Sequence, residues 1–474
     1  MGLMVRIQHG SFLILQEFYY FCRSIKTIQQ TLTMEISELY KLFVAHPTVT
    51  TDSRNCPEGS IFFALKGASF NGNHFAEKAL EQGCSYAVID ENTARRGVED
   101  SRFILVDDCL KTLQQLANYH RRTLGTPVIG ITGTNGKTTT KELVSAVLAE
   151  KYNVLFTEGN FNNDIGVPKT LLRLTREHEL AVVEMGASHP GDIRTLVDIA
   201  EPDFALVTNV GKAHLQGFGS FEGVMRTKAE LYDFMQVRRP DGLIFINADN
   251  AFLGEMRREH CPDVRCVTYG QGKEAGIRFH GEVIDCAPFL HFRWREEGKS
   301  AGWNDVRTHL IGAYNLDNML AAISIGTHFG VSAAQIGNAL ARYIPGNNRS
   351  QLEETVHNHL IMDAYNANPT SMNAALLNFR DMAVGPKMAI LGDMRELGKQ
   401  SLEEHAKVVS LLETLPFEEV WLVGEEFSRI ECRFRKFANV EEVKATLRAN
   451  RPEGFYILIK GSNGIHLAEL AEML

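Results

Sequence analysis

The sequence predicts an α/β protein with three domains. The chain has 474 residues, enough for three domains of roughly 150 residues each. Along most of the chain, short apolar runs alternate with amphipathic helical patterns, which is typical of sheets covered by helices. One apolar run leads through a glycine turn, from Gly133 to Gly136, into a helix, as happens at the ligand-binding edge of such sheets.

The apolar runs locate the expected strands. They span residues 62–65, 86–89, 103–106, 127–132, 180–184, 204–208, 387–391, 420–423 and 456–459. Runs this apolar suit strands that are covered on both faces. Helical patterns lie near residues 34–40, 75–82 and 110–122. We expect short linkers near residues 125–127 and 345–348, so that the domains span residues 34–124, 125–344 and 345–474.

Residues 1–33 differ from the rest of the chain. Gln16 and Glu17 interrupt the apolar run at residues 11–15, and no small-residue cleavage site follows, so we expect no signal peptide. No uncharged apolar run reaches the ~18 residues that a membrane span needs. A more natural start lies at Met34, and we expect residues 1–33 to form a poorly ordered extension.

The composition is that of a globular protein. Hydrophobic residues make up 44% and charged residues 23%, which excludes a disordered chain, a collagen and a coiled-coil rod. The net charge of −9 disfavours non-specific binding to nucleic acid or to anionic membranes. Eight cysteines are scattered without a CxxC pair, which favours reduced thiols in a cytoplasmic protein.

The glycine turn predicts a phosphate-binding loop. Gly133 and Gly136 allow several backbone N–H groups to face one anion, and the helix start adds its dipole. Lys137 is placed for the outer phosphates of a nucleotide, and Thr138 offers a hydroxyl to Mg²⁺. Ile131 stands where the usual Walker A pattern has its first glycine, so this loop is shorter. A plain glycine turn is the alternative, but strand, glycines, lysine and hydroxyl coincide here.

The loop sequence G-T-N-G-K-T-T, from Gly133 to Thr139, resembles that of the Mur ligases. These are ATP-dependent enzymes that build the peptide of bacterial cell-wall precursors. The stretches at residues 159–168, 363–372 and 391–398 are similar to those of the member that adds D-alanyl-D-alanine. The similarity runs from about residue 34 to the end of the chain.

The resemblance implies a small α/β domain for the UDP-sugar, a central ATPase domain with a mostly parallel sheet, and a Rossmann-like third domain. The implied reaction joins D-alanyl-D-alanine to UDP-N-acetylmuramoyl-tripeptide through an acyl phosphate, with ATP and Mg²⁺, in a cytoplasmic monomer. Closure of the third domain on the second would bring the parts of the site together.

Lys137, His214 and Lys228 are the catalytic residues that the resemblance implies. It also implies a metal site formed by Thr138, Glu184, His214 and a carbamate on Lys228. Glu184 ends an apolar strand, where α/β sheets bind ligands, although a surface carboxylate is the alternative. An ammonium repels Mg²⁺, whereas a carbamate is an oxygen ligand. Without the resemblance, Lys228 would be an ordinary lysine on a helix face.

The resemblance further implies a nucleotide-binding set and a substrate-binding set. Asn315 and Asn318 lie one helical turn apart, so both amides can face adenine, unless they only cap a helix. The nucleotide set is Gly133, Thr134, Asn135, Gly136, Lys137, Thr138, Thr139, Asn315, Asn318, Arg349 and Asp363. The substrate set is Ser53, Arg54, Asn160, Asn162, Asn163, Tyr365, Asn366 and Asn368. For Ser53 and Arg54, an ordinary Asx-turn is nearly as good an interpretation.

The chain departs from the family pattern at one position near its end. Lys460, Gly461 and Ser462 match the family, but Asn463 stands where an arginine is common. Any role of that arginine therefore does not transfer to this chain.

Two other classes of protein remain as alternatives. The first is a related ligase, either one that adds diaminopimelate or lysine or a folylpolyglutamate synthase; the Asn-rich stretches argue against both. The second is a nucleotide-gated binding protein, which needs neither a carbamate lysine nor a second substrate pocket.

Overall fold

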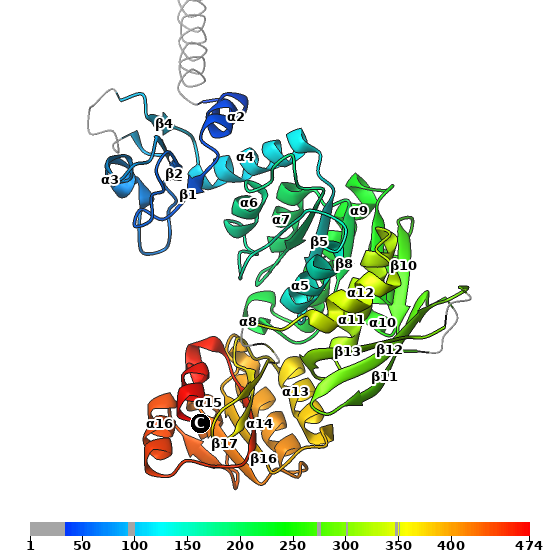
Figure 1. Cartoon of the computed structure of the whole chain (residues 1–474). Helices are drawn as coiled ribbons and strands as arrows, with labels where there is room; N and C mark the ends of the chain where they lie inside the picture. Colours follow the sequence, from blue (N-terminus) through cyan, green and yellow to red (C-terminus); the bar gives the residue numbers. More distant parts are fainter. Residues whose placement is uncertain (1–33, 93–99, 273–275, 300–301, 347–348, 350) are drawn as a thin grey trace, which may run out of the picture. The chain divides into compact units, whose positions relative to one another are not determined.

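The computed structural model divides the chain into two compact units (Figure 1). It describes residues 34–92, 100–272, 276–299, 302–346, 349 and 351–474. The extension predicted at residues 1–33, and residues 347–348 of the expected hinge, lie outside the described residues. The first unit runs to Gly125 and includes Pro168–Thr175, and the second holds Thr126–Val167 and Arg176–Leu474. The three predicted domain boundaries stay predictions.

The first unit contains a parallel sheet in the order β1-β2-β3-β4. Its strands are Val49–Thr50, Ile61–Phe63, Tyr86–Ile89 and Phe103–Leu105, and its helices are α2 (Ile36–Ala45), α3 (Ala76–Glu81) and α4 (Cys109–Leu124). Helix α2 packs on α4 and buries Leu39 and Phe43. Helix α4 begins where the Asp108 carboxylate accepts a hydrogen bond from the Lys111 N–H, and ends at Gly125 in the left-handed conformation. The strands predicted here are confirmed to within two residues.

The second unit is built on two sheets. The larger has nine strands in the order β13-β12-β11-β10-β9-β8-β5-β7-β6. In chain order from β5 these strands are Val128–Thr132, Val154–Phe156, Leu180–Glu184, Phe204–Val207, Leu243–Asn247, Arg265–Gly270, Phe279–Cys286, Phe289–Glu296 and Asn304–Ile311. The ladders are parallel except where β12 pairs with β11 and β13. The predicted mostly parallel sheet is therefore confirmed.

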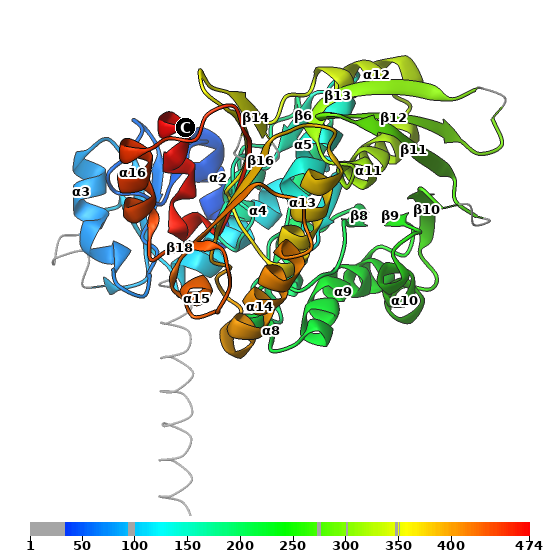
Figure 2. The same cartoon turned by 90° about the horizontal axis from the view of Figure 1, so that it is seen from below.

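Helices cover both faces of this sheet (Figure 2). Helices α5 (Lys137–Leu148), α11 (Asn315–His328) and α12 (Ala333–Arg342) pack on one face, and α7 (Asp192–Ala200), α9 (Phe221–Arg238) and α10 (Ala251–His260) on the other. The shorter helices α6 (Gly166–Leu171) and α8 (Leu215–Phe218) lie in loops after strands. Ile129 and Ile131 of β5 are fully buried against Leu143 and Val147 of α5, so the phosphate loop joins two rigid elements.

The smaller sheet has the order β14-β15-β19-β16-β17-β18, and only its β14 edge is antiparallel. Its strands are Gln351–Glu354, His359–Asp363, Lys387–Gly392, Glu419–Val423, Arg435–Phe437 and Tyr456–Lys460 in chain order, and its helices are α13 (Pro369–Asp381), α14 (Ser401–Leu412), α15 (Glu425–Ser428) and α16 (Val440–Ala449). Ala389 and Leu391 of β16 pack with α13 and α14, whereas Met388 and Ile390 pack with α16. This alternation is that of a central strand buried on both faces.

None of the described helices combines the length and the continuous apolar sequence that a membrane span requires. The described cysteines are free thiols.

Candidate functional site

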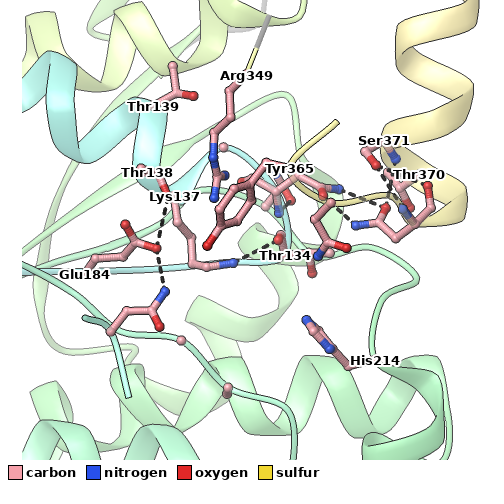
Figure 3. A pocket seen from close by; sticks show the side chains of 18 of the residues that line it. Thr134, Lys137, Thr138, Thr139, Glu184, His214, Arg349, Tyr365, Thr370 and Ser371 are labelled. Carbon is pink, nitrogen blue, oxygen red and sulfur yellow. Dashed lines mark hydrogen bonds between the residues drawn. The ribbon is translucent and has the colours of Figure 1, made fainter. Parts of the chain in front are cut away.

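A cavity of about 890 Å³ lies in the second unit, where β5, β7, β15 and β19 end (Figure 3). Ligands of parallel sheets bind at these carboxyl ends. Most of the predicted site residues line it: Thr134, Asn135, Gly136, Lys137, Thr138, Thr139, Asn160, Asn162, Asn163, Glu184, His214, Asn315, Asn318, Arg349, Asp363, Tyr365, Asn366 and Asn368. Gly133 lies in the same loop, Lys228 is buried in α9, and Ser53 and Arg54 lie in the first unit.

The two loop glycines are required by geometry. Gly133 has φ +144°, and a Cβ there would lie 2.0 Å from the Thr208 Oγ1. Gly136 has φ +75°, and a Cβ there would lie 2.6 Å from the Asn318 Oδ1. Side chains rarely adopt such φ values, and both spaces are already filled. The backbone can therefore curl between β5 and α5 only with glycine at both positions.

The loop is held by the end of β8. The Thr134 N–H donates to the Asn209 carbonyl at 2.9 Å, and the Asn135 N–H donates to the Asn209 Oδ1 at 3.0 Å. The Thr208 hydroxyl and the Asn209 amide both donate to the Asn135 carbonyl, at 2.6 Å and 3.0 Å. These four bonds fix the loop before any ligand binds.

Lys137 lies across its own loop. Its Nζ donates to the carbonyls of Gly133 at 2.8 Å and Thr134 at 2.9 Å. Burial lowers the pKa of Lys137 to about 8; the nearby Glu184 carboxylate opposes this shift and the Arg349 guanidinium adds to it. An anion bound on the loop would remove the electrostatic cost of this ammonium.

Glu184 ends β7 and is 1% exposed. Its Oε1 accepts hydrogen bonds from the Thr138 hydroxyl at 3.2 Å and from the Asn162 Nδ2 at 2.8 Å. Its Oε2 is buried and has no hydrogen-bond partner within the described part of the chain. A buried carboxylate oxygen without a partner costs stability unless a cation completes its coordination.

Glu184 and Thr138 fit a divalent cation. The unpartnered Oε2 of Glu184 and the Thr138 hydroxyl are hard oxygen donors on one side of the cavity. In the part of the chain that the structure describes, no group of three His, Cys, Asp or Glu side chains converges on a metal position. Such a sparse set suits Mg²⁺, which keeps several waters and takes its other ligands from substrate phosphates.

Lys228 is a buried lysine of α9, with 2% of its surface exposed. Its Nζ lies 5.7 Å from the centre of the Phe218 ring. Burial lowers the pKa of Lys228 well below its usual range, and repulsion from the Lys137 ammonium lowers it further. This environment disfavours a second ammonium and favours a neutral amine, the form that reacts with CO₂ to give a carbamate.

His214 lines the cavity and contacts a loop that follows a strand of the smaller sheet. Its Nδ1 forms an ion-pair contact with the Oε2 of Glu396, in the loop after β16. Both residues have positive φ, of 50° and 64°, which non-glycine residues seldom adopt. The contact lowers the pKa of the Glu396 carboxyl. Sequence reasoning missed Glu396, because nothing local marks a contact between residues so far apart in the chain.

Arg349 reaches the cavity between Lys137 and Tyr365 (Figure 3). Its guanidinium carbon lies 3.9 Å from the centre of the Tyr365 ring. Its Nε is buried and has no hydrogen-bond partner among the residues that the structure describes. Asp363, at the end of β15, accepts a hydrogen bond from the Lys460 Nζ at 2.7 Å. Arg349 therefore offers unused donors, whereas the Asp363 carboxylate is already partly satisfied.

Asn315 and Asn318 are buried at the start of α11 and bond to each other. The Asn318 Nδ2 donates to the Asn315 Oδ1 at 2.8 Å, and the Asn318 Oδ1 accepts from the Thr140 hydroxyl at 3.0 Å. The Asn315 Nδ2 donates to the Ile311 carbonyl at 2.8 Å. Neither side chain caps the helix, because its N-cap is Tyr314.

The Asn-rich stretches have mixed roles. Asn162 holds Glu184, whereas Asn163 accepts from the N–H groups of Ile165 and Gly166 at 3.2 Å and 2.8 Å, which orients the start of α6. Asn366 accepts from the N–H of the next residue. Asn368 caps α13 and also bonds to Asn135 of the loop.

Ser53 and Arg54 lie in the first unit. The Asp52 Oδ1 accepts from the Arg54 N–H at 2.9 Å, so the turn is an Asx-turn, as the plainer interpretation expects. The Arg54 Nη2 also pairs with Asp52 at 2.8 Å, and the Arg54 side chain is 87% exposed. Their role in substrate binding stays a prediction.

Several cavity residues were not predicted. Asp317, whose pKa is raised by burial, lies between the two asparagines of α11. Asn250 caps α10, and Asp192 opens α7 and accepts from the N–H groups of Ser188 and His189. The position of Asp317 in the same helical turn as Asn315 and Asn318 was the one signal that marked it.

Comparisons with known proteins agree with this geometry. Residues 47–121 match the family "Mur ligase family, catalytic domain", residues 131–326 match "Mur ligase middle domain", and residues 348–463 match "Mur ligase, glutamate ligase domain". A UDP-N-acetylmuramoyl-tripeptide–D-alanyl-D-alanine ligase of Bacillus subtilis (strain 168) is 33% identical over 464 residues, covering 95% of this chain and 98% of that protein.

Solved structures are similar over most of the chain. A crystal structure of MurF from Acinetobacter baumannii has a TM-score of 0.80 at 30% identity, covering 90% of this chain and 92% of that one. The MurF ligase from Thermotoga maritima in complex with ADP has a TM-score of 0.78 at 26% identity, covering 90% and 96%.

Proposed function

The chain belongs to the Mur ligase family, and on that premise we propose that it joins D-alanyl-D-alanine to UDP-N-acetylmuramoyl-tripeptide, using ATP. The product is the UDP-N-acetylmuramoyl-pentapeptide of peptidoglycan synthesis. The observation that carries the proposal is the convergence on one cavity of the loop lysine, Lys137, with Glu184 and Arg349. The relatives and solved neighbours named above carry the same ligase name or the name MurF, and one neighbour was solved with ADP.

The reaction needs activation, because a carboxylate at neutral pH has no leaving group for an amine to displace. Transfer of the γ-phosphoryl group of ATP to the tripeptide carboxylate gives an acyl phosphate and ADP. The amine of D-alanyl-D-alanine then attacks the acyl carbon. The bond between this carbon and the bridging oxygen breaks, so that the oxygen leaves with the phosphate, and the attacking amine loses a proton. The products are the new amide and inorganic phosphate.

The cationic side chains of the cavity offset the repulsion between the substrate carboxylate and the triphosphate of ATP. Two unit charges about 4 Å apart repel by roughly 4 kcal/mol at an effective dielectric constant of ~20, so a carboxylate approaches a triphosphate only against a barrier. Lys137 and Arg349 face this space, and donors held in place before reaction need no reorganisation. The phosphate-loop backbone, fixed by Thr208 and Asn209, would hold the β- and γ-phosphates.

Mg²⁺ is part of the proposal. Glu184, Thr138, His214 and Lys228 as a carbamate are the residues that would hold it, and the buried Glu184 Oε2 is the observation that supports this. Bound Mg²⁺ would neutralise charge on the transferring phosphoryl group. The carbamate would turn the repulsion between Lys228 and Lys137 into attraction.

The remaining assignments follow the same premise. Asn315 and Asn318 would contact adenine and Asp363 the ribose, while Asn160, Asn162, Asn163, Tyr365, Asn366 and Asn368 would line the path of the peptide substrates. Ser53 and Arg54 would contact the UDP-sugar. We further propose a cytoplasmic monomer.

The test is release of phosphate by the purified protein. We expect release only when ATP, UDP-N-acetylmuramoyl-tripeptide and D-alanyl-D-alanine are all present, with a pentapeptide product by mass spectrometry. A panel with free diaminopimelate, lysine or glutamate in place of the dipeptide separates the related ligases. Phosphate release without either peptide substrate would favour the nucleotide-gated binding protein.

A further inference from the structure

We propose that Lys460 is a positioning residue for the nucleotide: it holds the Asp363 carboxylate at the cavity so that one oxygen of this carboxylate accepts a hydrogen bond from a ribose hydroxyl. Lys460 thereby makes the chain select a nucleotide with this hydroxyl over an analogue that lacks it, although the lysine acts only through Asp363. Both side chains line the cavity. The inference rests on the proposed function, because ATP is the nucleotide of that reaction.

The two residues lie side by side at the carboxyl ends of neighbouring strands. Strands β15 and β19 are parallel, and Asp363 is the register partner of Lys460 in their ladder. The Lys460 Nζ donates to the Asp363 Oδ2 at 2.7 Å. The ion pair therefore follows from the pairing of the two strands, and it lies at the edge where parallel sheets bind ligands.

Lys460 is the buried member of the pair. Its side chain is 2% exposed, whereas that of Asp363 is 18% exposed. A buried ammonium is costly unless it is paired and hydrogen-bonded, and the Lys460 Nζ also donates to the Asn366 carbonyl at 3.2 Å. Within the described residues, Asp363 is the one carboxylate that pairs with Lys460. The lysine is thus engaged by the protein, while Asp363 keeps a surface toward the cavity.

One oxygen of Asp363 remains for a ligand. Among the residues that the structure describes, only Lys460 donates to this carboxylate, and it bonds to Oδ2. Because that bond fixes Oδ2, the carboxylate presents Oδ1 in one direction before a ligand arrives. Hydroxyl groups donate readily to a carboxylate oxygen, and an acid at the end of a strand binds ribose in this way in dinucleotide-binding folds.

The same lysine supports the turn that follows β15. Its bond to the Asn366 carbonyl holds the middle of this turn, and Asn368 at the end of the turn donates to the Asn135 Oδ1 of the phosphate loop at 2.7 Å. The position of Asp363 is therefore fixed relative to the phosphate loop. A ribose at Asp363 and phosphates on the loop can belong to one nucleotide, because both sites line the same cavity.

A second buried lysine of this sheet has a purely structural set of contacts. Lys387 begins β16, which is the other neighbour of β19, so it lies at the amino ends of the strands. Its Nζ donates at 2.7 Å to the carbonyls of Arg380 and Met382, at the end of α13. These bonds tie α13 to the sheet at the edge opposite to the cavity. Lys387 is therefore the matched control for Lys460.

The experiment measures binding of ADP, 2′-deoxy-ADP and 3′-deoxy-ADP by isothermal titration calorimetry, with excess Mg²⁺ and without peptide substrates. We expect wild type to bind at least one deoxy analogue roughly 10- to 100-fold more weakly than ADP, the effect of losing a hydrogen bond to a charged group. Lys460→Met should weaken binding of ADP but hardly that of this analogue, so that most of the discrimination is lost. Lys387→Met should keep the discrimination.

A double-mutant cycle tests whether Lys460 acts through Asp363. Asp363→Asn alone should remove the discrimination, and Lys460→Met added to it should cause little further loss, because the two residues act as a unit. In steady-state assays, Lys460→Met should raise the KM for ATP and leave kcat and the KM for the tripeptide near their wild-type values. If thermal melting shows that Lys460→Met does not fold, Lys460→Gln, which is polar but uncharged, should show the same loss of discrimination.

Equal weakening of all three nucleotides by Lys460→Met overturns the proposal, because it indicates direct contact with the phosphates or a general loss of structure. The same change in Lys387→Met, additive effects in the cycle, or a wild type that binds the three nucleotides alike also overturns it. Failure of the proposed function looks different: wild type would then bind nucleotide with this discrimination but release no phosphate in response to the peptide substrates.

Discussion

Asn368 donates through its Nδ2 to the Oδ1 of Asn135 at 2.7 Å, joining two residues 233 positions apart in the chain. Asn135 belongs to the phosphate loop, and Asn368 is the N-cap of α13 beside the smaller sheet. The bond is a direct link between the nucleotide loop and the part of the molecule to which we assign the peptide substrates.

Replacing Asn368 by serine should separate these two roles. Serine caps helices about as well as asparagine but is too short to reach Asn135. We expect kcat/KM to fall roughly 2- to 10-fold, the value of one neutral hydrogen bond, with thermal stability nearly unchanged. Asn439→Ser, at the N-cap of α16, is the control and should leave activity intact. Equal effects of both variants would mean that only capping matters.

Lys137→Ala should abolish most activity. Loss of a preorganised cation at a transferring phosphoryl group lowers kcat by roughly 10²- to 10³-fold. Lys41→Ala removes a lysine that is 70% exposed in the first unit and should have no effect. Steady-state phosphate release measures both variants, and a Lys137→Ala enzyme within a few-fold of wild type would contradict the role of the loop.

Lys228→Ala should lose most activity, and added bicarbonate should not restore it. In wild type, labelled ¹³CO₂ should give a carbamate signal by NMR that the variant lacks, because burial lowers the pKa of the Lys228 amine and so favours the form that reacts with CO₂. Lys141, also buried but bonded to the Thr157 carbonyl at 2.7 Å, should give no such signal. Full activity of Lys228→Ala would end the carbamate proposal.

His120 should make the first unit less stable in acid. Its Nε2 donates to the Leu174 carbonyl at 2.9 Å and its Nδ1 accepts from the Tyr40 hydroxyl at 3.1 Å, a pattern that the neutral ring satisfies. Burial lowers the pKa of His120 below its usual 6.5, although the bond to Leu174 opposes the shift. The unfolded state therefore binds the proton more readily.

The contribution of neutral His120 to the free energy of unfolding is fully present above pH 6.5, the usual histidine pKa. It is lost as the pH falls from there toward the lower pKa of His120 in the folded protein. The slope approaches about 1.4 kcal/mol per pH unit. Hydrogen exchange of α4 amides, corrected for intrinsic rates, measures it between pH 5 and pH 7.5. His120→Gln should remove the dependence and His74→Gln, at an exposed site, should keep it. A dependence that survives His120→Gln must come from another group.

The sequence predicted the parts of the fold that are marked by continuous apolar runs. Strands β5, β7 and β16 are fully buried and were found to within a residue. The antiparallel strands β11 to β13 were not predicted. In β12, buried Leu290, Phe292 and Trp294 alternate with His291 and Arg293, so half of its residues are polar. That two-residue period is weaker than an apolar run, but it was a readable signal.

In the candidate site too, some residues could be predicted from the sequence and others could not. The phosphate loop and Glu184 were marked by local patterns, and both line the cavity. Lys228 was expected only from the family resemblance, and it is buried close enough to Lys137 for the two charges to interact. The contacts of Glu396 with His214 and of Arg395 with Gly464 join distant loops, and no local pattern encodes them. Such residues become visible only once the sheet edges are in place.

The central claim is that the enzyme activates an inert carboxylate by phosphorylating it, and oxygen transfer tests it most directly. Tripeptide labelled with ¹⁸O in the reacting carboxylate is converted with ATP and D-alanyl-D-alanine, and the released phosphate is examined by mass spectrometry. The account predicts one ¹⁸O atom in each phosphate formed. One carboxylate oxygen bridges carbon and phosphorus in the acyl phosphate, and it leaves with the phosphate when its bond to carbon breaks. Phosphate free of label, formed together with the pentapeptide, would contradict it.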